Sequence, residues 1–424
     1  MIRFFLPESA DLVDPGFEFL TDSYTANRAG PEDDVYAHEL FGSPQCDGIL
    51  VTRSLIFPEK AKAVQRVGGI KQYLRLPESF PVIADCGAFQ YRDAEFPPYT
   101  CEETCEFYEQ LGFDYGISLD HMIFDFDPEY DAGSSLLART PTPEMERRFR
   151  LSLDNAKSMR QICVEKDYAF HLIGGVQGWS PESYHSAVKE LIDDGFDYVA
   201  LGGLARANDE QLKAVLEALR ETVVSSGTRL HILGVARLSL LEDYVNSNVA
   251  SCDSASALLQ AFKSNKDNYH TNEKNYTAVR IPPASGDLSP KVRKLLKNEV
   301  AKNGEEAGAS LHRELIQLEQ EALKNLRAYD AGELPLEEAM ASLIAYEDRF
   351  GDEKRYYPLF EETLRDRPWS RCPCKICQSA GIEVIIMRGN NRNRRRGFHN
   401  TWNFFQRFKE ERDRLQRAAA IEGD

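Results

Sequence analysis

Three aspartates and a glutamine follow short apolar runs that have the composition of buried strands. Asp85, Asp120 and Asp253 each close such a run, and Gln177 follows another. In a parallel α/β barrel all strands end at one face, the mouth, where chemistry takes place. A single strand-end aspartate often caps the next helix, but several unpaired carboxylates at one mouth repel each other unless they have a task. The grouping therefore predicts an active site.

Glycines accompany these polar residues at the predicted strand ends. They include the turn Gly202-Gly-Leu-Ala205 and Gly234. Glycine lets a ligand approach the backbone closely because it has no side chain. We expect the site to take a planar ligand.

A second group of residues has the spacing of metal ligands. Cys372, Cys374 and Cys377 lie within six residues, and His399 follows 22 residues after the last of them. Three thiolates and one imidazole make a complete tetrahedral set for Zn²⁺, with no position left for substrate or water. The sequence predicts a structural zinc site.

A basic run lies between these cysteines and the histidine. Its arginines are Arg388, Arg392, Arg394, Arg395 and Arg396. The whole chain has a formal charge of −17, which argues against a protein coated in basic residues but leaves room for one local basic face. The run is either a nucleic-acid-binding track or a solvated loop.

The order of predicted elements indicates the fold that positions these groups. Seven short, nearly continuous apolar runs alternate with amphipathic segments, some of which begin with helix caps such as Thr100, Thr142-Pro143 and Ser180-Pro181. Seven such units favour a closed (β/α)8 TIM barrel over an open sheet. We expect the eighth unit further along the chain. The seven runs are 48–51, 81–84, 115–119, 170–173, 198–201, 230–233 and 248–251.

The chain is predicted to have three consecutive parts. Residues 1–285 hold the barrel strands and helices with an N-terminal extension, and a Pro/Gly/Ser-rich break ends this part. Residues 286–366, dense in Glu, Lys, Leu and Ala, form a helical insertion whose plain interpretation is a structural bundle. Residues 367–424 form a zinc-binding subdomain and the final barrel helix.

Composition sets the protein class. The 424 residues are 42% hydrophobic, which is ample for a large core, and no apolar run approaches the roughly 20 residues that span a bilayer. The first residues turn acidic at once and lack a signal-peptide pattern. Nine cysteines fit a reducing compartment if they are thiols or metal ligands. We predict a cytoplasmic protein without membrane contact.

The motifs, in this order, resemble the tRNA-guanine transglycosylase superfamily over about residues 48–280 and 368–410. The resemblance rests on Asp85-Cys-Gly-Ala-Phe-Gln90, the Gly-Gly-Leu-Ala turn, Asp253, and the cysteine–histidine site followed by Asn400. The opening Phe5-Leu-Pro-Glu-Ser9 and the run 261–269 look like the DpdA branch, which inserts 7-deazaguanine bases into DNA.

The resemblance implies a covalent mechanism. Asp253 attacks C1′ of the target guanosine, guanine leaves, and a 7-deazaguanine such as preQ0 takes its place. Asp85 matches the general acid/base. A nearby carboxylate suits an oxocarbenium-like transition state because it stabilises positive charge and captures the sugar.

The same resemblance assigns base recognition. Asp120 accepts hydrogen bonds from the pyrimidine-ring edge, and Gln177 with the backbone of Gly203 and Leu204 reads the carbonyl and amine substituents. Cys86 departs from the serine of many relatives, which leaves its substrate contact in doubt. Phe89 is either a wall on which the base stacks or a core aromatic.

Nucleic acid is the implied partner, with DNA favoured over tRNA. The target nucleotide is extruded or met unpaired, since a barrel pocket cannot otherwise reach C1′. Helper proteins such as a DNA-opening ATPase and a homodimer are left open. The rival hypotheses are the same exchange on tRNA, a non-catalytic nucleic-acid-binding subunit, and an unrelated barrel with a zinc site.

Overall fold

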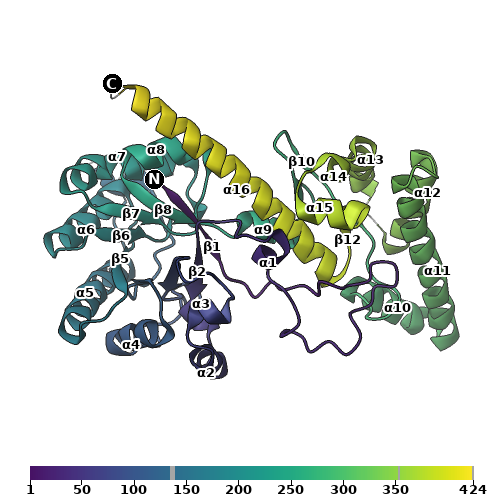
Figure 1. Ribbon diagram of the computed structural model, residues 1–424, viewed down its shortest axis with the longest axis horizontal. Helices are drawn as coiled ribbons and strands as arrows, with labels where there is room; N and C mark the ends of the chain where they lie inside the picture. Colours follow the sequence, from purple (N-terminus) through teal and green to yellow (C-terminus); the bar gives the residue numbers. More distant parts are fainter. Residues whose placement is uncertain (134–138, 352–353, 423–424) are drawn as a thin grey trace. The chain divides into compact units, whose positions relative to one another are not determined.

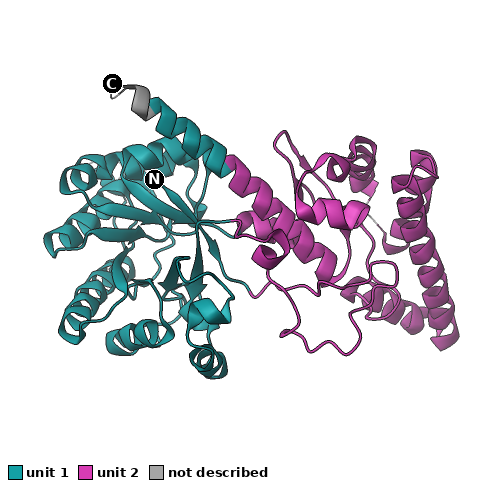
Figure 2. Ribbon diagram, in the orientation of Figure 1, with its two compact units in different colours: residues 1–9, 46–255, 408–424 teal, residues 10–45, 256–407 magenta. Residues whose placement is uncertain are grey.

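The chain forms two compact units. The computed structural model describes residues 1–133, 139–351 and 354–422 (Figure 1). Unit 1 comprises residues 1–9, 46–255 and 408–424, and unit 2 comprises residues 10–45 and 256–407 (Figure 2). Each unit is assembled from segments that are far apart in the sequence. The three consecutive parts expected from the sequence stay a prediction.

Unit 1 is a closed barrel of eight parallel strands in chain order. The barrel closes because β1 pairs with both β2 and β8. The (β/α)8 fold predicted from the alternating pattern is confirmed. The strands are β1 Arg3–Pro7, β2 Gly48–Thr52, β3 Val82–Asp85, β4 Tyr115–Ile117, β5 His171–Val176, β6 Tyr198–Leu201, β7 Arg229–Ile232 and β8 Val249–Asp253.

The eighth strand lies at the start of the chain, so the expectation that it lies further along is wrong. β1 is short and includes Arg3 and Pro7, and residues 10–45 of unit 2 separate it from β2. Because no barrel helix follows β1 directly, the alternation of strands and helices in the sequence does not identify β1 as a barrel strand. Its central residue, Phe5, is nevertheless fully buried.

Helices cover the outside of the barrel in Figure 1. The predicted caps are present: the hydroxyls of Thr100, Thr142 and Ser180 accept hydrogen bonds from backbone N–H groups three residues later. The end of α16, from Phe408, belongs to unit 1, where the Phe408 ring packs on Phe4 at 5.7 Å between centroids. The helices are α2 Pro58–Arg66, α3 Ile70–Tyr73, α4 Cys101–Leu111, α5 Pro143–Lys166, α6 Pro181–Asp193, α7 Asp209–Ser226, α8 Leu241–Asn246 and α16 Gly389–Glu422.

The barrel interior is a packed layer of apolar side chains, including Phe5, Ile83 and Ile173. Side chains two residues apart on a strand point to the same face. Asp85, two residues after Ile83, therefore points into the barrel end beyond this layer. The interior packing sets the direction of the strand-end side chains.

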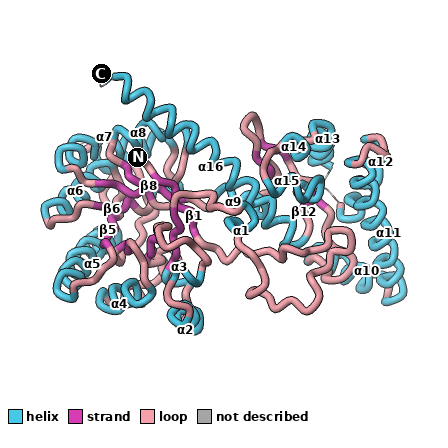
Figure 3. The backbone as a smooth tube through the Cα atoms, viewed as in Figure 1, coloured by secondary structure: helices cyan, strands magenta, loops and turns pink. Residues whose placement is uncertain are grey.

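Unit 2 combines helices with two small sheets. The segment 10–36 is irregular (Figure 3). In the part of the chain predicted to be helical, Leu311, Leu315 and Leu318 have helical spacing and all lie on α11, Glu305–Asp330. No helix among the described residues has the length and apolar content needed to cross a membrane. The elements are α1 Ala37–Phe41, α9 Ser256–Lys263, α10 Pro290–Asn303, α11 Glu305–Asp330, α12 Leu336–Glu347, α13 Tyr357–Asp366, α14 Pro368–Arg371, α15 Lys375–Ala380, antiparallel β9 Tyr269–His270 and β10 Asn275–Tyr276, and parallel β11 Val279–Arg280 and β12 Ile386–Met387.

Candidate active site

Asp85 is the last residue of β3 and carries a strongly perturbed carboxyl group. It lies beside Thr52 of β2 in the barrel register. Burial, together with the negative charges of Asp120 and Asp253, raises the pKa of Asp85 to about 7, although hydrogen bonds from the Gly87 backbone and the Thr52 side chain act in the opposite direction. A carboxyl group with this pKa can give or take a proton near neutral pH.

Asp253 is the last residue of β8, and its carboxylate is held by two donors. Oδ1 accepts a hydrogen bond from the Gly234 backbone N–H at 2.9 Å and lies 3.2 Å from Nε2 of His231. The residue is 4% exposed. The carboxylate is therefore fixed in direction yet still reached by solvent.

Asp85 and Asp253 lie at the same end of the barrel. Both end parallel strands, and the charge of Asp253 contributes to the raised pKa of Asp85. The structure thus brings these two residues, which are far apart in the sequence, to one mouth, and their catalytic roles stay a prediction. Neither carboxyl group is locked in an ion pair with lysine or arginine among the described residues.

A chain of buried hydrogen bonds leads to Asp253. The Tyr198 hydroxyl lies 2.5 Å from Oγ of Ser251, which in turn lies 2.5 Å from Nδ1 of His231. A carboxylate oxygen accepts hydrogen bonds, so Nε2 of His231 is the donor toward Asp253, and in that tautomer Nδ1 accepts from the Ser251 hydroxyl. His231 is fully buried. Its position inside an apolar strand run gives no sign of this contact in the sequence.

Asp120 forms a second polar cluster at the mouth. Its Oδ2 accepts a hydrogen bond from Nε2 of Gln177, and its Oδ1 accepts one from the Cys86 thiol at 3.0 Å. The Tyr91 hydroxyl contacts the Cys86 sulfur at 3.1 Å and the Asp120 carbonyl at 3.0 Å. Burial raises the pKa of Asp120, and the hydrogen bonds from Cys86 and Gln177 partly offset this. Cys86 is fully buried, so it supports Asp120 from within.

The predicted glycine turn lies against this cluster. A Cβ atom on Gly202 would lie 2.1 Å from Nε2 of Gln177 and 3.2 Å from Oδ2 of Asp120. Gly203 has a φ of +78°, and a Cβ there would lie 2.7 Å from Oε1 of Gln177. Leu204 is fully buried and begins the 3-10 helix Leu204–Arg206. Both glycines are required by this close approach.

Phe89 lies on the loop that leaves β3, four residues after Asp85. Its side chain is 54% exposed, so the alternative of a core aromatic is wrong. The Arg92 guanidinium lies over the ring, 4.5 Å from its centroid. The ring is available to a ligand.

The three cysteines and the histidine predicted as metal ligands come together in unit 2. Nδ1 of His399 lies 3.5, 3.4 and 3.4 Å from the sulfurs of Cys372, Cys374 and Cys377. Roughly 3.6 Å separates nitrogen and sulfur in a tetrahedral zinc site, so the donor set fits. Nε2 of His399 donates to the His270 carbonyl at 2.8 Å, which fixes the ring orientation that a metal needs. This group can hold a metal ion such as zinc.

The basic run is internal to unit 2, which contradicts its prediction as a nucleic-acid track. Arg388, Arg392, Arg395 and Arg396 are at most 5% exposed. Arg388 pairs with Asp22 and Glu319, Arg392 with Asp22 and Glu383, and Arg394 with Asp11. Arg395 and Arg396 donate to backbone carbonyls. Guanidinium groups buried in this way serve folding, because a phosphate cannot reach them.

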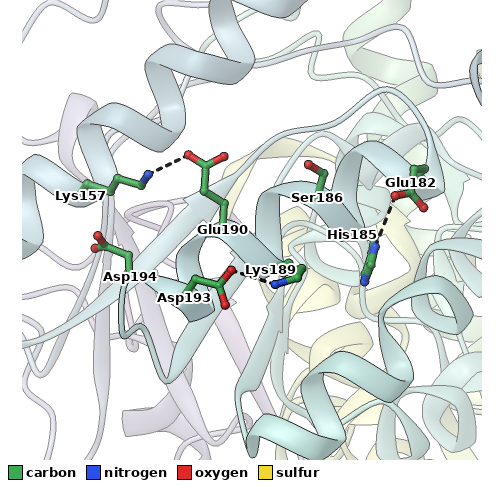
Figure 4. Close-up of a pocket in the computed structure, with 8 residues that line it drawn as sticks. All are labelled: Lys157, Glu182, His185, Ser186, Lys189, Glu190, Asp193 and Asp194. Atoms are coloured by element: carbon green, nitrogen blue, oxygen red, sulfur yellow. Dashed lines mark hydrogen bonds and ion pairs between the residues drawn. The ribbon is translucent and has the colours of Figure 1, made fainter.

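A groove between α5 and α6 is unrelated to the strand ends. Figure 4 shows its lining, in which Lys157 pairs with Glu190 at 2.8 Å and Lys189 with Asp193 at 2.9 Å. His185 contacts Glu182 at 3.5 Å. These charges neutralise one another along the helix surface and leave no convergent donor set.

Comparison with known proteins agrees with this geometry. No family model matches the chain. A protein of Salmonella montevideo described as a DNA-guanine transglycosylase is 36% identical over 425 aligned positions, which cover 96% of this chain and 97% of the relative. The similarity includes the barrel and the metal-ligand region because it runs over nearly all of both chains. This chain therefore belongs to the guanine transglycosylase family and is an enzyme of that class.

Proposed function

We propose that the enzyme replaces a guanine in DNA with a 7-deazaguanine such as preQ0, as a member of the DpdA branch. The observation that carries the proposal is the shared mouth of Asp253 and Asp85, one carboxylate held in direction and one carboxyl group with a pKa near 7. The name of the Salmonella relative supports DNA as the substrate.

In the first half-reaction Asp253 is the nucleophile. Its carboxylate oxygen forms a bond to C1′ of the deoxyribose while the bond from C1′ to N9 of guanine breaks. The electron pair of that bond goes to guanine, and protonated Asp85 delivers the proton that neutralises the leaving base. The Gly234 N–H and His231 keep Asp253 aimed at the sugar.

In the second half-reaction the incoming base reverses these steps. Ionised Asp85 removes the N9 proton of the 7-deazaguanine, N9 attacks C1′, and the bond to Asp253 breaks. Two displacements at C1′ return the sugar to its original configuration. One carboxyl group serves as acid and then as base, which its pKa near pH 7 favours.

Asp120 and Gln177 form the base-recognition cluster. A carboxylate accepts hydrogen bonds from the N–H groups on the pyrimidine edge of guanine, and a carboxamide both donates and accepts. The backbone of Gly203 and Leu204 reads the remaining substituents, and exposed Phe89 stacks on the base plane. Cys86 acts through Asp120, since its thiol donates to that carboxylate.

The metal in unit 2 is proposed to be Zn²⁺ in a structural role. Cys372, Cys374, Cys377 and His399 supply four ligands, which fill a tetrahedral shell. The Tyr269 ring stacks on His399 at 4.1 Å between centroids, and its hydroxyl lies 3.1 Å from the Cys377 sulfur. A bound ion would join α15 and α16 to β9, and it takes no part in the base exchange.

Base exchange with radiolabelled guanine tests this function. Purified enzyme is incubated with single-stranded DNA, plasmid DNA and bulk tRNA, and then chased with unlabelled preQ0. We expect incorporation of guanine into DNA and its release by preQ0, with no incorporation by Asp253→Asn. Single-stranded DNA removes the need for a duplex-opening helper such as an ATPase. Labelling of tRNA alone would favour the same chemistry on tRNA and refute the DNA assignment.

A further inference from the structure

The exposed phenylalanines of this protein are not scattered. Of the 23 phenylalanines, four in the described chain are largely exposed: Phe57, Phe89, Phe96 and Phe124, at 65, 54, 55 and 39%. Single exposed apolar residues are ordinary, but these four share one location. All lie on loops that leave the carboxyl ends of the adjacent strands β2, β3 and β4, and so lie along one side of the mouth that holds Asp85 and Asp253.

Guanidinium groups cover two of these rings besides Phe89. The Arg147 guanidinium, in the first turns of α5, lies 5.0 Å from the Phe96 centroid, and that of Arg206 lies 5.6 Å from the Phe124 centroid. Arg147 also pairs with Glu144 at 2.8 Å. Arg206 is exposed and has no carboxylate within ion-pair distance among the described residues. In a chain of net charge −17 this cation at the mouth is available to an anion.

The loops that carry these rings are tied to the base-recognition cluster. Tyr91, on the same loop as Phe96, donates to the Asp120 carbonyl at 3.0 Å. Nε2 of His121 lies 2.8 Å from the Ala94 carbonyl, and Arg148 donates to the Met122 carbonyl at 2.7 Å. The loops after β3 and β4 are therefore held against each other beside the site, and their exposed rings have a defined position.

We propose that Phe57, Phe96, Phe124, Arg147 and Arg206, the mouth surface, bind the unpaired nucleic-acid strand next to the target nucleotide. Aromatic faces stack on any base, and guanidinium groups pair with the phosphates between them. This combination fits a single strand better than a duplex, whose bases are already stacked. The proposal rests on the proposed function and supplies the nucleic-acid contact that the buried arginines of unit 2 do not.

Binding without turnover separates this surface from the chemistry. The full-length, zinc-loaded Asp253→Asn protein is titrated into a fluorescein-labelled single-stranded oligonucleotide and into its duplex, and anisotropy is recorded at several salt concentrations. In this background Phe96→Ala, Phe124→Ala and Arg206→Gln are compared with Val164→Ala, which removes an apolar residue 71% exposed near the end of α5, far along that helix from the mouth. Equal melting temperatures establish that every variant is folded.

We expect each Phe→Ala change to weaken single-strand binding about 5- to 100-fold, since stacking contributes about that much per base. Arg206→Gln should weaken single-strand binding and reduce the slope of log affinity against log salt concentration by about one, because one phosphate contact is lost. The affinity of Val164→Ala for the single strand should stay within twofold of that of the Asp253→Asn parent. The Phe→Ala and Arg206→Gln changes should weaken duplex binding less than single-strand binding. If both Phe variants bind the single strand as tightly as the Asp253→Asn parent, the proposal is overturned. The exposed rings would then be assigned to contact with a protein partner. If the variants bind the single strand more weakly but the enzyme with Asp253 intact exchanges no base on DNA or tRNA, the binding surface stands and the proposed function is refuted.

Discussion

Asp85→Asn should make the fold more stable while it removes activity. The pKa of Asp85 is raised from 3.8 to about 7 by burial and by the charges of Asp120 and Asp253. The folded protein therefore holds this proton more tightly than the unfolded chain does. The stability that this provides is complete below pH 4 and is lost as pH rises toward 7. Asparagine cannot ionise, so the variant does not suffer that loss.

The size of the effect follows from the pKa values in the two states. One pKa unit corresponds to about 1.4 kcal/mol, so the raised pKa of Asp85 lowers the free energy of unfolding, relative to its value below pH 4, by roughly 4 kcal/mol at pH 8 and by roughly 2 kcal/mol at pH 5. The increase in the free energy of unfolding that Asp85→Asn produces, relative to wild type, should accordingly be about 2 to 3 kcal/mol larger at pH 8 than at pH 5. Base exchange should fall about 10²- to 10⁴-fold, the usual contribution of a general acid/base.

Urea unfolding of wild type and variant at both pH values measures this difference. Asp209→Asn is the matched control, because hydrogen bonds from Ser239 and Arg237 lower the pKa of Asp209. Asp209 is ionised in the folded and unfolded states at both pH values. The substitution Asp209→Asn should therefore change the free energy of unfolding by the same amount at pH 5 and at pH 8. A gain for Asp85→Asn that does not depend on pH would refute the reasoning.

Three further changes test the parts of the site. His231→Phe keeps a ring but loses the hydrogen bond to Asp253. We therefore expect kcat to fall about 10- to 100-fold with little change in KM for the base. A change in KM alone would contradict the positioning role of His231. Gly202→Ala should displace the Gln177 amide and raise KM for guanine at least tenfold, measured by initial rates, whereas a wild-type KM would show that the turn has room. Cys374→Ser should lower both the zinc content, measured by plasma mass spectrometry, and the melting temperature, and a protein that stays equally stable without metal would remove the structural role.

Much of the barrel could be predicted because its signals are local. Strands buried on both faces are short apolar runs, and each run ends where the chain reaches the mouth. The ends of these runs place Asp85 and Asp253 at the mouth even where the strand pairing is unknown. The metal ligands were equally accessible, since three of the four lie within six residues.

The remaining features depend on contacts between distant residues. His231 is one polar residue in an apolar run, and only the register of β7 with β8 brings it to Ser251 and Asp253. The charge density of the basic run does not reveal that Asp22, more than 360 residues away, neutralises two of its arginines. Local composition cannot distinguish a guanidinium in an internal ion pair from one that faces solvent.

The covalent bond between enzyme and DNA is the most direct test of the central claim. Wild-type enzyme and Asp253→Asn are quenched in denaturant during exchange on single-stranded DNA, and peptides are analysed by mass spectrometry. A deoxyribose–DNA ester on the peptide that contains Asp253, absent from the variant, is the predicted result. Exchange that continues in Asp253→Asn, or an adduct on a different residue, would contradict the mechanism.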